Sequence, residues 1–358
     1  MGKRNKVTTR DIAEYTGLSQ STVSMILSGK KNVSFMPQTE KKVRDAAKKL
    51  GYSKPVKKAP VLDTNLENTI LLLAPLLTNS YYTSVIHSIA QQASKYGYDV
   101  FTAVTFRDSG KETEYLSLAK RSRLAGIIIL YPIIEVGLAN KISKDVPVVQ
   151  IGEKPDNIRF DSVELDSSKP GLLMGQHLLS LGHKKIAFIS SPMKKHEISR
   201  RRRLAGLKAA LEEEGLNPDL IEVYTPTSAE FKKYGYQSAE YRTGYEMTKK
   251  ALSCETKATA FVGQNDMTAY GIMAALSDQG YRIPADYSVA GFDDSRFSSM
   301  PQISLTTVEH YAVLKGQDAV NLIYDRNHQS RSGQRITRME YEPNLIRRRS
   351  TGKAPMDS

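Results

Sequence analysis

The sequence predicts a small all-α helix-turn-helix domain, followed by a larger α/β domain of two lobes with parallel sheets. Three observations support this fold class. The chain has 358 residues, more than one small core needs. Its first 62 residues hold 14 Lys and Arg against four acidic residues, so they carry +10 of the net charge of +13. From Thr69 onward, short apolar runs alternate with helical patterns, as in βαβ units.

Composition excludes several classes of protein. The single cysteine, Cys254, rules out an intramolecular disulfide framework and a zinc site built from several cysteines. The longest apolar runs, at 70–74 and 126–131, are far too short to span a bilayer, so no membrane association is expected. The basic N-terminus continues into polar residues and not into an apolar stretch, which argues against a signal peptide. The expected compartment is therefore the cytoplasm.

Three short helical patterns lie in the basic segment. Thr8 opens a Thr-x-x-Asp pattern that is typical of a helix start. Ser19 can cap a second helix over 20–27, which has apolar residues at i, i+3 and i+4. Pro37 suits the first turn of a third helix, and Gly51 can end it. This pattern indicates a helix-turn-helix with a supporting helix; a three-helix bundle that binds protein is the alternative.

In a helix-turn-helix, the second helix enters the major groove of DNA and its first side chains reach base edges. Gln20, Ser21 and Met25 lie on the predicted outward face. A glutamine can bond adenine with two hydrogen bonds, and a methionine can contact a thymine methyl group. Hydroxyl and ammonium groups suit phosphates, which position the protein without specifying sequence. The predicted phosphate contacts are Thr8, Ser19, Thr22, Ser24, Lys30 and Lys31. Thr9, next to Thr8, is also predicted to contact DNA.

Residues 9–27 (TRDIAEYTGLSQSTVSMIL) and the segment 39–52 resemble the headpiece of the LacI/GalR family of bacterial repressors. Thr9 and Leu18 depart mildly from the family, which usually has an aliphatic residue and a valine there. The resemblance implies a transcriptional regulator that binds double-stranded operator DNA. Because the symmetry of such a protein is mirrored in its site, a homodimer on a pseudo-palindromic operator is expected.

The DNA-binding domain is predicted at 1–53 and a hinge at 54–68. The hinge contains Pro55, Pro60 and three lysines, which is typical of a semi-extended connector. The family resemblance implies a short helix here that forms on the operator and wedges a leucine into the minor groove. Leu62 is the candidate leucine. Pro60 is compatible with such a helix only if the helix begins there.

The large domain, 69–350, should bind a ligand where the carboxyl ends of parallel strands meet. Helical patterns lie at 82–96, 171–181, 203–214 and 268–280. The predicted strands are 69–74, 99–105, 126–130, 147–151, 185–190, 258–262 and 288–291.

The resemblance extends over the large domain through the segments 180–189, 203–206, 264–271, 291–294, 305–308 and 343–350. It implies the periplasmic-binding-protein-like fold, in which the chain crosses between two lobes three times. The expected crossings are near 166, 299 and 333. Lobe 1 would then comprise about 69–165 and 299–332, and lobe 2 about 166–298 and 333–350, with a tail at 351–358.

A small effector, expected to be a sugar, would bind between the lobes. Sugar recognition needs carboxylate, amide and guanidinium groups aimed at hydroxyls, together with an aromatic face. Arg203 and Asp293 match the effector-binding arginine and aspartate of the resembled family. Asn265 follows a predicted strand, although a turn role is an alternative. Tyr81 and Tyr82 follow the first strand and are candidates for the aromatic wall.

Other polar residues nearby are expected to be structural. Asp266 is interpreted as a helix N-cap and the run 200–202 as a solvated face. The stretch around 231–245 is long for the family, so Tyr236 and Tyr241 stay equal candidates for a further aromatic contact.

Motifs for catalysis are absent: there is no Gly-rich phosphate loop, no H-E-x-x-H and no G-x-S-x-G. The six histidines are scattered without metal-site spacing. No enzyme activity, cofactor or metal is therefore expected. The alternatives to an effector-controlled repressor are a regulator controlled by a phosphocarrier protein, a sugar-binding receptor without regulatory function, and an enzyme on the two-lobed fold.

Overall fold

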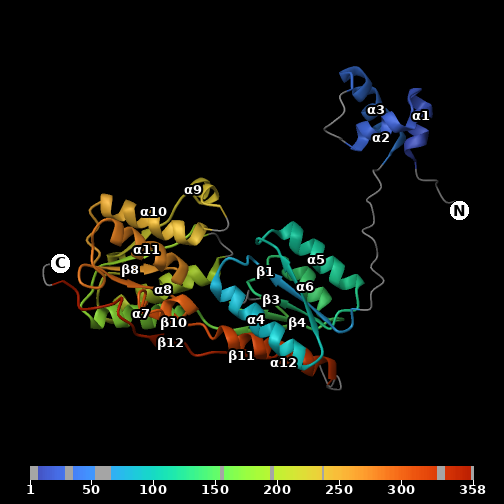
Figure 1. Cartoon of the computed structure of the whole chain (residues 1–358). Coiled ribbons are helices and arrows are strands. Elements are labelled where there is room, and N and C mark those ends of the chain that lie inside the picture. The colour runs from blue at the N-terminus through green and yellow to red at the C-terminus, as the bar shows by residue number, and fades with distance from the viewer. Residues whose placement is uncertain are drawn as a thin grey trace. The chain divides into compact units, whose positions relative to one another are not determined.

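A computed structural model describes residues 7–28, 35–52, 66–153, 157–193, 197–235, 238–328 and 335–355 (Figure 1). The chain divides into two compact units, Met1–Asp63 and Thr64–Ser358, called here the headpiece and the large unit. The predicted hinge residues Pro60 and Leu62 and the predicted DNA contacts Lys30 and Lys31 lie outside the described residues. No described helix has the length and apolar character needed to cross a membrane.

The headpiece contains the three predicted helices, α1 (Thr9–Thr16), α2 (Gln20–Ser28) and α3 (Pro37–Leu50). Thr8 caps α1 in a reciprocal capping box, and Gly17 and Gly51 end α1 and α3 with positive φ. The three helices bury one small apolar core, which consists of Ile12, Ala13, Val23, Ile26, Val43, Ala46 and Ala47.

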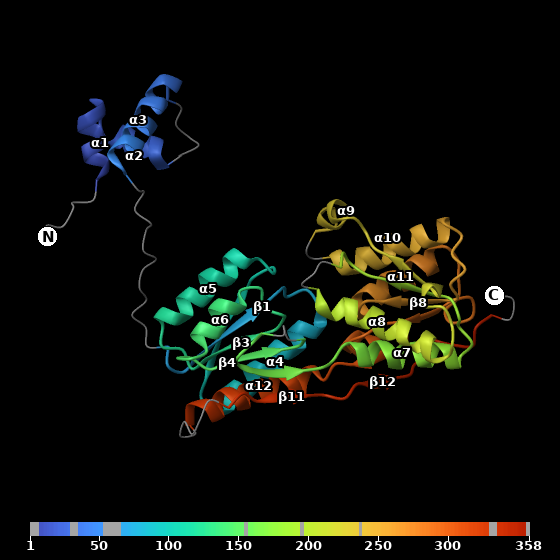
Figure 2. The ribbon, with the colours of Figure 1, turned by 180° about the vertical axis from the view of Figure 1, so that it is seen from behind.

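Lobe 1 of the large unit has a six-stranded parallel sheet in the order β11-β5-β4-β3-β1-β2. Alternate residues of β1 pack on opposite faces: Leu72 contacts the cluster of α4 and α12, and Leu73 the cluster of α5 and α6 (Figure 2). Because both faces are covered, the central strands are apolar throughout. The bounds are β1 (Thr69–Ala74), α4 (Ser80–Lys95), β2 (Asp99–Val104), α5 (Ser109–Arg121), β3 (Gly126–Ile129), α6 (Val136–Ile142), β4 (Val148–Ile151), β5 (Asp161–Glu164), α12 (Ala312–His328) and β11 (Arg338–Glu340).

Lobe 2 has a four-stranded parallel sheet in the order β7-β6-β8-β9, with α7 and α8 on one face and α10 and α11 on the other. A separate antiparallel pair joins β10 to β12. The bounds are α7 (Ser168–Ser180), β6 (Ile186–Ile189), α8 (Ile198–Glu213), β7 (Ile221–Tyr224), α9 (Ser228–Lys233), α10 (Ala239–Ser253), β8 (Ala260–Gly263), α11 (Asp266–Asp278), β9 (Ser288–Ala290), β10 (Thr307–Glu309) and β12 (Asn344–Ile346), with 3-10 turns at Pro218–Leu220 and Arg296–Ser299.

All seven predicted strands are present, with ends shifted by one or two residues. The strands β5, β7, β10, β11 and β12 were not predicted. They are three or four residues long, and several carry charged residues, as in β5 (DSVE) and β11 (RME). A short strand with charged residues lacks the apolar run that marks a buried parallel strand.

The second and third crossings between lobes lie later in the chain than expected. β10 stays in lobe 2, because Thr306 bridges to Ala290 and Glu309 bridges to Asp293 at the edge of its sheet. The second crossing is therefore between β10 and α12, not near 299. β11 still belongs to the sheet of lobe 1, so the third crossing lies between β11 and β12, not near 333.

Two glycines allow α7 and α8 to cross closely. A Cβ on Gly171 would lie 2.2 Å from the Arg203 carbonyl oxygen, and one on Gly206 would lie 2.0 Å from the Ser168 carbonyl oxygen. A Cβ on Gly175 would lie 2.5 Å from the Ala210 Cβ of α8, so the G-x-x-x-G segment at 171–175 is a packing motif. This close crossing fixes the position of Arg203, on α8, beside the first turn of α7.

Candidate functional site

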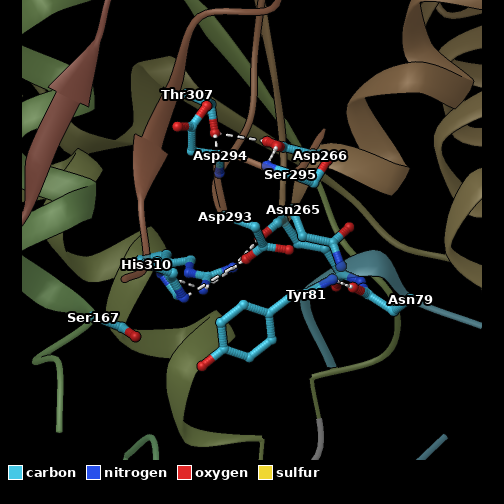
Figure 3. A network of polar contacts seen from close by, with 12 residues as sticks. Asn79, Tyr81, Ser167, Asn265, Asp266, Asp293, Asp294, Ser295, Thr307 and His310 are labelled. Carbon is cyan, nitrogen blue, oxygen red and sulfur yellow. Dashed lines mark hydrogen bonds and ion pairs between the residues drawn. The ribbon is translucent and has the colours of Figure 1, made fainter. Parts of the chain in front are cut away.

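The large unit has a pocket between its lobes, at the carboxyl ends of the parallel strands. Tyr81, Tyr82, Arg203, Asn265 and Asp293, the five residues predicted from the sequence, all line it. Among these five, lobe 1 contributes Tyr81 and Tyr82, and lobe 2 contributes Arg203, Asn265 and Asp293. Figure 3 shows Tyr81 beside Asn265 and Asp293. The structure therefore brings together residues that lie as far as 212 positions apart in the chain.

The lobe 1 wall is built on the start of α4. Asn79 caps this helix, because its side-chain oxygen accepts a hydrogen bond of 2.8 Å from the Tyr81 N–H. The cap places Tyr81 in the first turn, where its ring meets Tyr82 edge-on at 5.3 Å and His310 at 5.5 Å. These edge contacts hold an aromatic surface at the pocket, as a sugar ring requires.

Arg203 is 6% exposed and held on several sides. Its Nη1 donates to the Gln264 carbonyl oxygen, and its Nη2 donates to His310 Nε2 at 3.0 Å. Because a guanidinium only donates, His310 must accept at Nε2 and is neutral. Burial, followed by the nearby cations Arg203 and Lys315, lowers the pKa of His310 far below its usual range.

Asp293 follows β9 and lies 3.7 Å from both Arg203 Nη2 and His310 Nδ1. Its backbone has φ of 132°, and that of Asp294 has φ of 48°. Positive φ is unfavourable for residues with a Cβ and is often retained where a functional group must be aimed. Burial raises the pKa of Asp293 well above its usual value, against the opposing effect of Arg203.

Asn265 takes the helix-capping role that was expected of Asp266, and it also lines the pocket. Asn265, not Asp266, caps α11, and its oxygen accepts from the Thr268 N–H at 3.0 Å. Asp266 is the first helical residue, fully buried, and it accepts hydrogen bonds that hold the loop after β9 (Figure 3). Its three donors are the Ser295 N–H at 2.8 Å and the hydroxyls of Ser298 and Thr307, each at 2.6 Å. The interpretation of Asp266 as the N-cap was therefore wrong.

Polar contacts also join the two lobes at the pocket. Arg107 of lobe 1 donates to Glu197 of lobe 2 at 2.9 Å, and Asn79 donates to Glu240 at 2.7 Å. Arg200 lies 3.4 Å from Glu197, is only 16% exposed at its side chain and lines the pocket. The expectation of a solvated face holds for the exposed Arg201 and is wrong for Arg200, which lies three residues before Arg203 and therefore on the same side of α8. Arg202 is partly exposed and pairs with Glu153 at 2.6 Å.

Several pocket residues were not found from the sequence, including Arg107, Glu153, Glu240, His310 and Lys315. Most of them lie in loops after strands, where nothing local separates a ligand contact from a solvated side chain. Lys315 had a usable signal. It is a charged residue on the apolar side of α12, which otherwise buries Gly316, Ala319, Val320 and Ile323.

A second pocket adjoins the first and shares Arg107, Glu197, Arg200 and Glu240 with it. Tyr241 lines this outer pocket and not the inner one, while Tyr236 lies outside the described residues. Among the described residues, no group of three or more His, Cys, Asp or Glu side chains could hold a metal ion.

The predicted DNA-contacting residues of the headpiece lie on or beside α2. Gln20, Ser21 and Ser24 are exposed, whereas Thr22 and Met25 are half-buried. Ser19 accepts a hydrogen bond of 3.1 Å from the Thr22 N–H, which confirms it as the cap of α2.

Two further predicted DNA contacts lie at the start of α1. Thr9 accepts a hydrogen bond of 3.2 Å from the Gln20 side chain. Thr8 forms the capping box with Asp11. The hydrogen bond between Gln20 and Thr9 connects the first turns of α1 and α2, the region that faces DNA in a helix-turn-helix.

Comparison with known proteins agrees with this arrangement. A family model described as bacterial regulatory proteins, lacI family, matches residues 8–54, and one described as a periplasmic binding protein-like domain matches residues 176–351. The HTH-type transcriptional repressor PurR of Mannheimia succiniciproducens is 30% identical over 97% of this chain and 99% of its own length. The chain belongs to the LacI family of bacterial regulatory proteins.

Solved structures of LacI family members share the fold. A LacI family transcriptional regulator from Enterococcus faecium with bound ribose is 26% identical, with a TM-score of 0.68 over 80% of this chain and 100% of its own. The lac repressor dimer bound to operator and the anti-inducer ONPF is also 26% identical, with a TM-score of 0.63 over 97% of this chain and 100% of its own. The two-lobed α/β fold with parallel sheets is thus confirmed as that of LacI family regulators.

Proposed function

We propose that this LacI family member represses transcription by binding a pseudo-palindromic operator as a homodimer, and that a small carbohydrate effector in the interlobe pocket changes its affinity for that operator. The observation that carries the effector assignment is the lining of one pocket by Arg203, Asn265, Asp293 and Tyr81. Planar polar groups facing an aromatic surface match the hydroxyls and the apolar face of a sugar. Binding chromosomal DNA requires that the protein work in the cytoplasm.

The headpiece supports the DNA-binding half of the proposal. The exposed Gln20 and Ser21 and the half-buried Met25 would read bases, and the hydroxyls around the capped starts of α1 and α2 would bind phosphates. Leu62, Lys30 and Lys31 are added as contacts from the sequence and the family resemblance. The net +10 of the first 62 residues favours a polyanionic partner.

Control by an effector needs two arrangements of the lobes that bind it unequally. Effector contacts to Arg203 and Asp293 in lobe 2 and to Tyr81 in lobe 1 would all form only when the lobes are close. The operator affinity then changes by the ratio of effector affinities in the two arrangements, and the coupling is reciprocal. Nothing in this scheme requires the effector to be chemically altered, so we propose that the protein is not an enzyme.

Selection of DNA from a random library by the full chain tests the proposal, followed by fluorescence anisotropy with the selected duplex. We expect two half-sites related by two-fold symmetry, and a change of at least about tenfold in affinity with one carbohydrate of a panel. Arg203→Lys, which keeps the charge and loses the forked geometry, should bind the same duplex and lose the effector response. Binding without sequence preference at low salt, or an effector response unchanged in Arg203→Lys, would contradict it.

A further inference from the structure

The side chain of Lys315 is buried at the interlobe pocket, and its ammonium has no acceptor among the described residues. Lys315 lies in the first turn of α12, is 1% exposed and lines the pocket. Its Nζ lies 5.9 Å from the centre of the Tyr341 ring. Among the described residues it makes no hydrogen bond and no ion pair, in contrast to the cations around it.

The carboxylates near Lys315 are already engaged by other groups. Glu153 accepts from Arg202 at 2.6 Å and from the Ser167 N–H at 2.5 Å. Asp293 lies beside Arg203. The carboxylates of Glu153 and Asp293 thus each have a cationic partner other than Lys315, and the ammonium of Lys315 has no ion-pair partner among the described residues.

Arg203, beside Lys315 in the pocket lining, has a buried donor that is unsatisfied. Arg203 Nε is buried without a hydrogen-bond partner, although both terminal nitrogens of the same guanidinium donate. A buried donor without an acceptor costs free energy, and a buried charge without a partner costs more. Burial, then the positive charge of Arg203, lowers the pKa of Lys315 to about 7. An anion in the pocket would supply the missing acceptor.

We propose that the effector is a sugar acid whose carboxylate pairs with Lys315. This inference rests on the proposed function, because it names the chemical class of the ligand for the same pocket. The hydroxyls of the acid would meet Asp293 and Asn265, and its ring would face Tyr81. A neutral sugar would leave the ammonium without a counter-charge.

A carboxylate fits the pocket better than a phosphate ester. The pocket lining holds as many carboxylates (Glu153, Glu197, Glu240 and Asp293) as cations (Arg107, Arg200, Arg203 and Lys315), so a monoanion disturbs the charge balance less than a dianion does. One unpaired ammonium also balances one negative charge.

Isothermal titration calorimetry of the full chain tests this assignment. The probes are D-glucuronate and D-galacturonate, their neutral counterparts D-glucose and D-galactose, and D-glucose 6-phosphate. At least one acid should bind at least about tenfold tighter than its neutral counterpart. Lys315→Met, which removes the charge and keeps the length, should abolish this preference. Lys95→Met removes a charge from the outer end of α4 and should retain it.

The outcomes separate this inference from the proposed function. A neutral sugar that binds as tightly as its acid and releases operator would overturn the sugar-acid assignment and leave the proposed function standing. A preference for the phosphate ester would overturn the choice of a carboxylate. If no probe binds or changes operator affinity, the effector half of the proposed function fails as well. Lys315→Gln repeats the test if the methionine variant does not fold.

Discussion

Two aspartates near helix starts show how differently the headpiece and the large unit hold their polar groups. Asp11, exposed in the first turn of α1, accepts hydrogen bonds from the Thr8 N–H at 2.7 Å and the Thr8 hydroxyl at 2.8 Å. Asp266, at the start of α11, is fully buried and holds three donors from later segments. Hydrogen bonds lower the pKa of Asp11, whereas burial raises the pKa of Asp266.

The difference follows from what each unit must present. In the headpiece, a small apolar core supports polar side chains that stay in water, where a DNA surface can reach them. In the large unit, polar side chains are buried and depend on partners from distant segments, because together they shape a pocket. We therefore expect substitutions of polar residues to have small, local effects in the headpiece and large, cooperative effects in the large unit.

The largest effect is expected from Asp266→Ala. The substitution leaves a buried N–H and two buried hydroxyls without their acceptor, so the free energy of unfolding should fall by about 3 kcal/mol. Hydrogen exchange with mass spectrometry should show faster exchange around β9, β10 and α11, with wild-type rates in the headpiece. An equal increase of exchange rates in the headpiece and the large unit would contradict the proposed difference between the two units.

The matched control is Asp266→Asn. The amide keeps the side-chain volume and one oxygen acceptor, so it should restore a large part of the lost stability. An asparagine variant as unstable as the alanine variant would show that both carboxylate oxygens are needed as acceptors, since the amide nitrogen cannot accept a hydrogen bond.

The next effect concerns Lys315, whose pKa of about 7 lies below its usual value of 10.5. Between these pH values Lys315 is protonated in the unfolded chain and deprotonated in the folded chain. The free energy of unfolding of the wild type therefore rises by up to about 1.4 kcal/mol for each unit of increasing pH. Lys315→Met lacks this gain. Its stability advantage over wild type should be largest near pH 7 or below and should narrow toward pH 9.5.

Urea unfolding of both proteins between pH 6 and 9.5 measures this difference. The other charged or titratable groups around Lys315 are Asp293, Glu153, Arg203, His310 and Tyr341, and both proteins contain them. The difference between the two stability curves therefore reports Lys315 together with its effect on the pKa values of Asp293 and His310. A constant difference across this range would mean that the ammonium keeps an ordinary pKa in the folded protein.

Local signals made the headpiece and the sheets predictable from the sequence. A cap such as Thr8, Ser19 or Gly51 acts over three or four residues, and a buried parallel strand is apolar along its whole length. Short edge strands with charged residues lack that pattern, which is why β5 and β11 were missed. The lobe crossings were misplaced for the same reason, because they depend on which sheet β10 and β11 join.

Pocket residues were predictable from the sequence mainly where they lie in a recognisable motif. Arg203 and Asp293 match family segments, and both line the pocket. Asn265 and Asp266 are adjacent, and either residue type can cap a helix; the choice depends on Ser298 and Thr307, which only the fold brings near. Other charged and polar pocket residues, such as Arg107, Glu153 and Lys315, come from loops and from α12. Long-range packing brings them to the pocket, and no local sequence pattern reports it.

A smaller effect is expected from Met25→Ala on α2. Loss of an apolar contact with a base should change the preference among operator variants by about tenfold and leave non-specific binding intact. Ser24→Ala is the control, since a lost phosphate contact should weaken all sequences alike. Binding selections with both variants distinguish these patterns. If Met25→Ala also weakens all sequences equally, α2 is oriented differently on DNA.

The smallest effect is expected from Asp11→Asn. The amide oxygen can still accept from Thr8, but the negative charge near the start of α1 is lost. Because the pKa of Asp11 is lowered in the folded state, its contribution to stability is present above about pH 4 and disappears as the pH falls through the folded value. Hydrogen exchange of α1 should therefore be slightly faster than in wild type at pH 7 and the same near pH 3. Loosening that spreads to α3 would show that the headpiece, like the large unit, depends on its polar groups cooperatively.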